Sequence, residues 1–394
     1  MLNLLLAAGF LMVLMALTYL KEKIGKDRLF HTNLDYILLG FLLALFLHAA
    51  PDTLPDIHAD NWVSVVTLLY GIIFGSRFNF RNFLDKNSDE WKMVYFPFIL
   101  GGLLLAGGWL ILWKVYGEVP HAWLAVLITL VLIMISNSRE LITILIKNQV
   151  QAPAGLIRQF NIITVSTDVI AISVFGLVIA YLVPDVSAGL GFRPLEWIVI
   201  NVLVGVVGGA LAVLMLGREP NDYNLAVVLV AHILVLSVAT IYFKFAPLFT
   251  GMIWSAVILN FYKDQEHFTT FLYRFERPVF SFVYVAAGFL VAPSALGWAA
   301  ALVLVYVALR MGLKVLAARQ AFYSSDNPVW WTDNIGLMLT GQGGLALAMS
   351  INLVFIMGGP LTDLLHAVTV LGVILFQVIG LKLIRTYLNT YVTR

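Results

Sequence analysis

One carboxylate lies inside a segment that is long and apolar enough to cross a bilayer. Asp168 is the only charged residue in Phe160–Tyr181, which reads FNIITVSTDVIAISVFGLVIAY. A carboxylate at that depth is costly unless it is protonated, paired or in contact with water, so it marks an ion-binding or proton-carrying site by default. Because desolvation penalises the bare anion, Asp168 is expected to hold either a proton or a cation. A packed, protonated carboxyl with only a structural role is the alternative.

Two other apolar segments contain residues that weaken a helix. Ser136-Asn137-Ser138, followed by Arg139 and Glu140, interrupts the segment 121–146, and Gly341-Gln342-Gly343-Gly344 interrupts the segment 332–357. Ser and Asn compete for backbone hydrogen bonds, and glycine disfavours a helix interior. Two interrupted helices in corresponding places indicate the central site of a secondary transporter. The glycines have close helix packing as their alternative role.

Two cationic residues also stand at membrane depth. Arg310 and Lys314 are four residues apart in the segment 297–317, so they share one face of a helix. Lys314 is close enough to the end of that segment to extend to the membrane surface instead. Otherwise, these residues are expected to balance the charge of Asp168.

The composition requires a membrane to position these residues. Of the 394 residues, 61% are hydrophobic and 12% are charged, and the mean hydropathy is +0.93, which excludes a soluble globular protein. The chain has no cysteine, which excludes disulfides, iron–sulfur clusters and thiol catalysis. Its net charge of +2 without a basic stripe predicts no nucleic-acid partner, and seven scattered histidines predict no structural metal.

Apolar runs of about 20 residues predict membrane-spanning helices. We expect thirteen, with the first retained rather than cleaved as a signal peptide, near 2–20, 33–49, 62–76, 93–116, 121–146, 159–183, 195–216, 223–243, 246–262, 278–293, 297–317, 332–357 and 363–386. No soluble regulatory domain is expected within 1–394.

The basic residues of the loops predict an orientation. Lys and Arg gather after the first, third, fifth and ninth spans and in the C-terminal tail, whereas Ala49–Asn61 has three aspartates and no basic residue. Basic loops face the cytoplasm, which places the N-terminus outside and the C-terminus in the cytoplasm. The two interrupted spans, the fifth and the twelfth, are seven positions apart in the order of spans, and this odd offset is what an inverted repeat requires.

The chain resembles the monovalent cation:proton antiporter superfamily, which includes the Nha-type sodium/proton antiporters and the Kef-type potassium/proton systems. Four pieces carry the resemblance over nearly the whole chain. They are LLYGIIFGSRFNFRNF at 68–83, the pair of central helices ending in VSTDVIAI around Asp168, ERPVFSFVYVAAGFL at 276–290, and the pair Arg310-x-x-x-Lys314 with GQGGLALA after it.

The resemblance implies a fold and a site. The fold would be a single all-α polytopic membrane domain with an inverted repeat and two crossed discontinuous helices. Core helices at about 93–183 and 297–386 would move against a dimerising scaffold at about 1–76 and 195–293. The implied ion and proton site is Asp168 with Thr167, Thr164, Ser136 and Asn137; Lys314 and Arg310 balance charge, and Glu140, Arg139 and Gln342 are further candidates.

Two departures from the family pattern concern charge. Thr167 stands where the family usually has Asn, Asp or Gln, and Asn137 replaces the usual acid of the first break. Thr167 therefore cannot pair with Lys314, and the usual argument for electrogenic two-proton exchange does not transfer.

The resulting expectation is exchange of Na⁺ or K⁺ for H⁺ by alternating access in a multi-pass protein of the cell membrane. No cofactor is expected beyond the transported ions. Membrane lipid and a second copy of the chain in a homodimer are the expected partners, and ligand gating of the Kef type would require a separate regulatory subunit. The alternatives are a sodium-coupled symporter of organic anions on the same fold and a non-transporting sensor or scaffold. No hydrolytic triad or HExxH pattern is present, so an enzyme is not expected.

Overall fold

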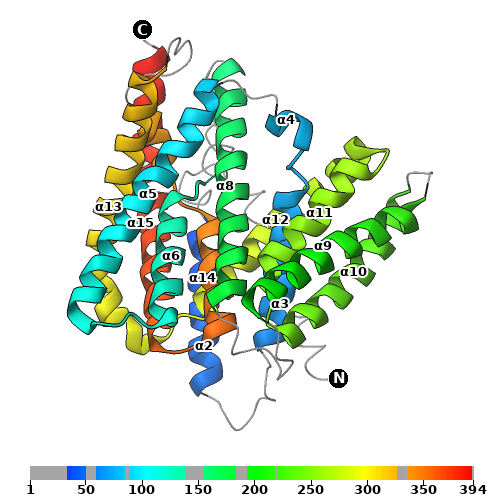
Figure 1. The fold of residues 1–394 in the computed structure, drawn as a ribbon, viewed down its shortest axis with the longest axis horizontal. Coiled ribbons are helices and arrows are strands. Elements are labelled where there is room, and N and C mark those ends of the chain that lie inside the picture. The colour runs from blue at the N-terminus through cyan, green and yellow to red at the C-terminus, as the bar shows by residue number, and fades with distance from the viewer. Residues whose placement is uncertain are drawn as a thin grey trace.

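The protein is described from a computed structural model that covers residues 33–49, 59–84, 88–138, 154–182, 193–217, 221–325 and 335–392. Within these residues every regular element is a helix (Figure 1). The elements are α2 (Leu34–Ala49), α3 (Ala59–Gly75), α4 (Phe80–Leu84), α5 (Ser88–Tyr116), α6 (His121–Ile135), α8 (Ala154–Leu182), α9 (Pro194–Leu216), α10 (Asp222–Phe243), α11 (Pro247–Phe261), α12 (Gln265–Phe289), η3 (Pro293–Ala295), α13 (Leu296–Tyr323), η4 (Ile335–Thr340), α14 (Gly344–Met357) and α15 (Pro360–Val392).

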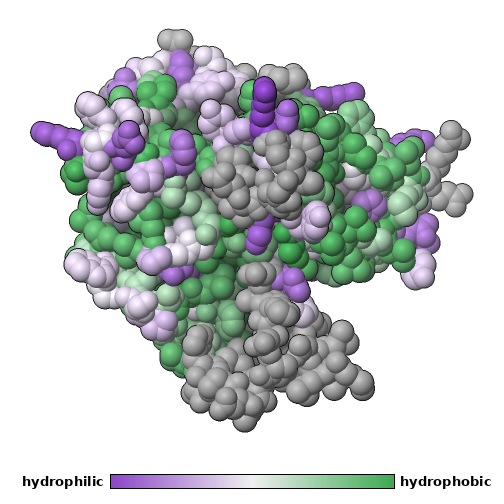
Figure 2. Space-filling model, turned by 60° about the horizontal axis from the view of Figure 1, so that its bottom comes forward, coloured by the Kyte–Doolittle hydropathy of each residue, from purple (hydrophilic) through white to green (hydrophobic). Residues whose placement is uncertain are grey.

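The helices are those of a multi-pass membrane protein. Among the described residues, six are long and apolar enough to span a membrane, and five shorter apolar helices accompany them. Large hydrophobic side chains of α9, α10 and α13 are exposed, and hydrophobic residues cover much of the visible surface (Figure 2). Such a surface is stable in contact with lipid and costly in water.

The expected spans agree with the helices. The first span lies outside the described residues, and each of the other twelve coincides with a helix, the twelfth with η4 and α14 together. The largest difference is at α12, which begins at Gln265 rather than near 278. Its first half carries Glu266, Arg274 and Glu276, so hydropathy alone underestimates the helix.

Both expected breaks are present. Helix α6 ends at Ile135, and residues 136–138 have no helical structure. The second break separates η4 from α14 at residues 341–343. Helix α6 contacts α14, and η4 contacts α13 and α15. Arg310 of α13 bonds to the carbonyls of Ser136 and Gly341, so the two breaks lie together.

The helix contacts repeat when each span is exchanged for the one seven places along the chain. With α2 as the second span, α2 packs on α12 while α11 packs on α3, and α6 packs on α8 while α14 packs on α15. The first pair of contacts also shares its chemistry. Gly288 of α12 lies against the Ile37 carbonyl of α2, and Gly71 of α3 lies against the Leu248 carbonyl of α11. This agreement supports the inverted repeat.

The helices pack in two groups. Helices α5, α6, α8, α13, α14 and α15 contact one another, as do α2, α3, α9, α10, α11 and α12, and Figure 1 shows α8 and α14 between the two. The groups meet where α8, α14 and α15 contact α3, α9, α11 and α12, a boundary that we call the seam. A moving core and a static scaffold stay a prediction.

Candidate functional site at the helix breaks

Asp168 lies near the middle of α8 and is 1% exposed. Its Oδ1 accepts a hydrogen bond of 2.9 Å from the backbone N–H of Asn137, the second residue after α6 ends. Across the described residues, Asp168 forms no ion pair. The helix break therefore presents a backbone donor to the carboxylate, and a second oxygen remains for a proton or a cation.

Asn137 connects Asp168 to Lys314. The Lys314 Nζ donates to Asn137 Oδ1 at 2.7 Å and also to the carbonyl of Ile135. Lys314 is 1% exposed, so it is buried at the break and does not extend to a membrane surface. The amide of Asn137 thus takes the position in which an acid would form an ion pair.

Arg310 joins the two breaks. Its guanidinium is fully buried and donates five hydrogen bonds, all to backbone carbonyls. Three go to the end of α6, to Ile133 (2.7 Å), Met134 (2.6 Å) and Ser136 (2.8 Å), and two go to the other break, to Thr340 (3.3 Å) and Gly341 (2.8 Å). One side chain therefore fixes the spacing of both interrupted helices.

These contacts identify the groups to which the two cations bond, and their balancing of the Asp168 charge stays a prediction. The carbonyl end of a helix carries a partial negative charge, and carbonyls left over at a helix end need donors. Arg310 and Lys314 neutralise these carbonyls, and neither bonds to Asp168. The carboxylate is left without a hydrogen-bonded cation.

The three expected hydroxyl ligands are buried and bonded to their own helices. Ser136 Oγ donates to Ile133, Thr164 Oγ1 to Asn161 and Thr167 Oγ1 to Ile163, at distances of 2.8, 3.1 and 2.8 Å. A hydroxyl that donates its proton keeps its lone pairs for a cation. Thr164 is one helical turn before Asp168 and shares its face, whereas Thr167 is its chain neighbour and points in another direction.

Gln342 belongs to the second break. Its Nε2 donates to the hydroxyl of Tyr306, and among the described residues its buried Oε1 has no hydrogen-bond partner. Gly372 makes room for this pair, because a Cβ there would meet the Tyr306 ring at 2.5 Å.

Tyr306 was missed by sequence reasoning. A signal was present, since Tyr306, Arg310 and Lys314 form a buried stripe at four-residue spacing along α13. Arg139 and Glu140 lie outside the described residues.

A pocket of about 320 Å³ lies at the seam beside the first half of α8. Asn161, Ile162, Val165 and Ser166 of α8 line one side, and Ser76 to Asn79, Phe83, Leu259, Thr269 and Tyr273 line the other. Arg77 Nη2 lies 2.5 Å from Glu276 Oε1, an ion pair that joins the end of α3 to α12. Asn161 and Val165 precede Asp168 by two turns and one turn on nearly the same face of α8, so this part of the pocket lining is close to the carboxylate along the helix.

Among solved structures, the chain is similar to MjNhaP1, the sodium/proton antiporter from Methanocaldococcus jannaschii, with a TM-score of 0.65 and 12% identity over 96% of this chain and 99% of that chain. This chain has the sodium/proton antiporter fold. The expected fold class is therefore confirmed, and the similar protein is a transporter. No protein-family model and no curated protein matches the chain.

The described residues contain no cluster of three or more His, Cys, Asp or Glu side chains. A cation at this site would be held by Asp168 together with neutral oxygens. Oxygen ligands of this kind suit hard cations.

Proposed function

We propose that this protein exchanges a monovalent cation, Na⁺ or K⁺, for protons by alternating access across the cell membrane, with Asp168 as the shared site. The observation that carries the proposal is the state of Asp168, a buried carboxylate with one backbone hydrogen bond and no ion pair within the described residues. The fold shared with a sodium/proton antiporter supports it.

Competition at one carboxylate couples the two ions. An unpaired anion in a low-dielectric site is stabilised by a proton or by an alkali cation, and each removes the need for the other. Thr164 Oγ1 supplies a neutral oxygen on the same face of α8. Exchange follows when Asp168 is exposed to one side of the membrane at a time, with either ligand bound.

The two cationic side chains at the breaks take no part in this competition. Because Arg310 and Lys314 are bonded to backbone carbonyls, their side chains stay in place while Asp168 changes partner. The same bonds leave neither cation directed at an organic anion, so no observation favours the symporter alternative.

Proteoliposomes with an internal pH dye and an imposed proton gradient test this function. Adding Na⁺, Li⁺ or K⁺ to wild type should collapse the gradient for at least one cation and so name the ion. Asp168→Asn should abolish the effect. A gradient that responds to none of the three cations would exclude the antiporter and favour the symporter or the sensor.

A further inference from the structure

The two ends of the seam differ. We call the end that holds the pocket, where α3 ends and α8 begins, the pocket end, and the opposite end the far end. Tyr273 of α12 lines the pocket and Ala287 lies in the last turn of the same helix. At 1.5 Å per residue these positions are roughly 20 Å apart, about two thirds of the thickness of the hydrocarbon core.

The far end is closed by close packing next to α8. A Cβ on Gly176 would overlap the Phe249 ring of α11, so the ring lies directly on the helix backbone. Gly176 is two turns beyond Asp168, whereas Val165 of the pocket is one turn before it. Along α8, Asp168 therefore lies between the pocket and this close contact with α11.

A buried histidine joins the two helix groups at the far end. His366 of α15 is fully buried, and its Nε2 lies 2.9 Å from the carbonyl of Ala287 on α12. Its Nδ1 lies 2.9 Å from the hydroxyl of Ser350 on α14. Since a carbonyl only accepts, Nε2 carries a proton, and Nδ1 of a neutral ring can only accept from the Ser350 hydroxyl, whose one proton can also be donated to the Leu347 carbonyl of its own helix at 2.9 Å. One ring thus links α12 to both α14 and α15.

A second polar contact lies in the same region. The backbone N–H of Leu248, in the first turn of α11, donates to Asn352 Oδ1 of α14 at 3.4 Å. This contact is long, so the His366 bonds are the stronger link between the groups at this end.

We propose that His366 is a positioning residue that holds the far end of the seam closed while Asp168 communicates with the pocket. The inference rests on the proposed alternating access, since only a protein that alternates has to break this link. Opening the far end separates α12 from α14 and α15, which breaks the bond from His366 to Ala287. His366 therefore stabilises one of the two access states.

Cysteine accessibility tests the proposal without a transport assay, and the chain contains no native cysteine. Val165→Cys reports on the pocket, and Ala246→Cys, buried next to the start of α11, reports on the far end. Detergent-solubilised protein is labelled with a polar maleimide, so both ends are accessible. His366→Ala should raise the labelling rate at Ala246→Cys by about tenfold, the ratio expected for one lost buried hydrogen bond, and lower it at Val165→Cys.

Two variants distinguish the loss of the His366 link, which we call the latch, from a general loosening of the protein. His366→Gln keeps one donor and one acceptor and should return both labelling rates toward wild type. His232→Ala is the matched control, because His232 Nδ1 contacts only the Val228 carbonyl of its own helix α10, at 2.8 Å. Ser350→Ala removes the hydroxyl that contacts the His366 ring, a milder change, and should shift both labelling rates in the same direction as His366→Ala. It replaces His366→Ala in the test if that variant does not fold.

The proposal is overturned if neither rate changes, or if both sites gain accessibility together as they would in a loosened protein. Because labelling needs no ion flux, a failed exchange assay with a positive labelling result would remove the proposed function and keep the latch.

Discussion

Asp168 accepts a hydrogen bond from one backbone amide, while the two buried cations nearest to it bind carbonyl and amide oxygens instead. Arg310 bonds to both breaks and Lys314 bonds to Asn137, so both side chains are held in place. In the proposed mechanism, Asp168 is the group that exchanges a proton for a cation.

Replacing Arg310 with lysine tests whether the guanidinium holds the two breaks together. Arg310→Lys keeps the charge but offers three donors where the guanidinium makes five bonds to two breaks. Unpaired buried carbonyls should lower the free energy of unfolding by about 2–4 kcal/mol. Thermal unfolding followed by tryptophan fluorescence measures it. Arg319→Lys, exposed on the same helix, is the control, and equal stability of the two variants would contradict the role given to Arg310.

A substitution at Thr164 tests whether its hydroxyl is a neutral ligand of the cation. Thr164→Val keeps the shape of the side chain and removes the oxygen one turn before Asp168. Losing one ligand of a charged ion should raise the KM for the cation by about tenfold, with little effect on kcat. Thr369→Val removes a hydroxyl that is likewise buried and bonded to its own helix, on α15, and should leave KM unchanged. Equal effects of the two variants would exclude Thr164 as a ligand.

At the residue scale, the sequence predicted which charged residues lie at membrane depth better than it predicted the groups to which they bond. An isolated carboxylate in an apolar run is visible in the chain, as are Arg310 and Lys314. Their acceptors are backbone carbonyls at helix ends, and every residue has a carbonyl. Only the folded structure could identify the ones that Arg310 binds.

At the scale of the helices, glycine sets the closest contacts. Gly71 of α3 lies against the backbone of α11, and a Cβ there would overlap the Leu248 carbonyl. Gly71→Ala should force the helices apart and destabilise the protein by about 1–3 kcal/mol, as overpacking does. Gly312→Ala on α13 is the control, since nothing lies within 4 Å of its added Cβ. Thermal unfolding of both variants measures the change in stability. If Gly71→Ala leaves the stability unchanged, the backbones of α3 and α11 are not in close contact at this position.

Helices and breaks were predictable because each has a direct cause in the sequence. Apolar length predicts a span, and Ser136-Asn137-Ser138 or three glycines predict an interruption. The polar first half of α12 and the short helix α4 were missed, because hydropathy does not distinguish a polar helix from a loop. The inverted repeat was inferred from spacing alone, and the paired contacts of α2, α3, α11 and α12 now support it.

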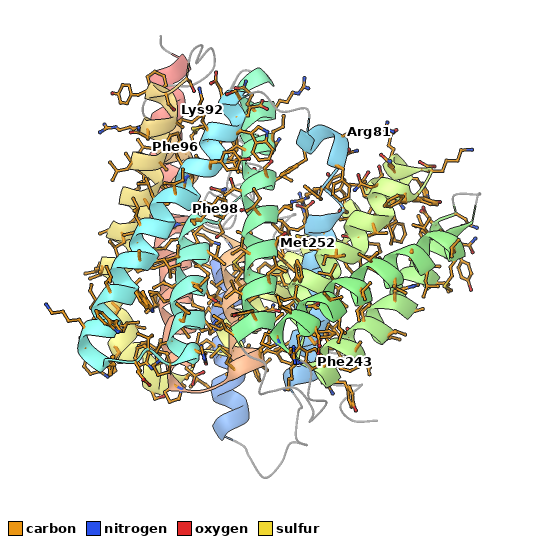
Figure 3. The ribbon with its side chains drawn as sticks, viewed as in Figure 1. Arg81, Lys92, Phe96, Phe98, Phe243 and Met252 are labelled. Atoms are coloured by element: carbon orange, nitrogen blue, oxygen red, sulfur yellow. The ribbon has the colours of Figure 1, made fainter. Side chains whose placement is uncertain are left out.

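At the scale of the whole molecule, two basic residues mark one end of the bundle. Arg81 and Lys92 lie at the same end as the C-terminus, and Phe243 lies toward the opposite one (Figures 1 and 3). This arrangement agrees with the loop charges that place this end in the cytoplasm. The orientation itself stays a prediction.

Labelling of intact cells tests the orientation. A membrane-impermeant maleimide should label Glu118→Cys, exposed in the loop after α5, and should label Arg81→Cys only after the cells are permeabilised. The chain has no cysteine of its own, so wild type is the blank. The opposite pattern would reverse the orientation and make the pocket face the outside.

The central claim is that a cation and a proton compete for Asp168. The most direct measurement is proton release when Na⁺ or K⁺ is added to the detergent-solubilised protein in weakly buffered solution. The account predicts proton release with wild type, saturating with cation concentration, and none with Asp168→Asn. Cation binding without proton release, or unchanged release from Asp168→Asn, would contradict it.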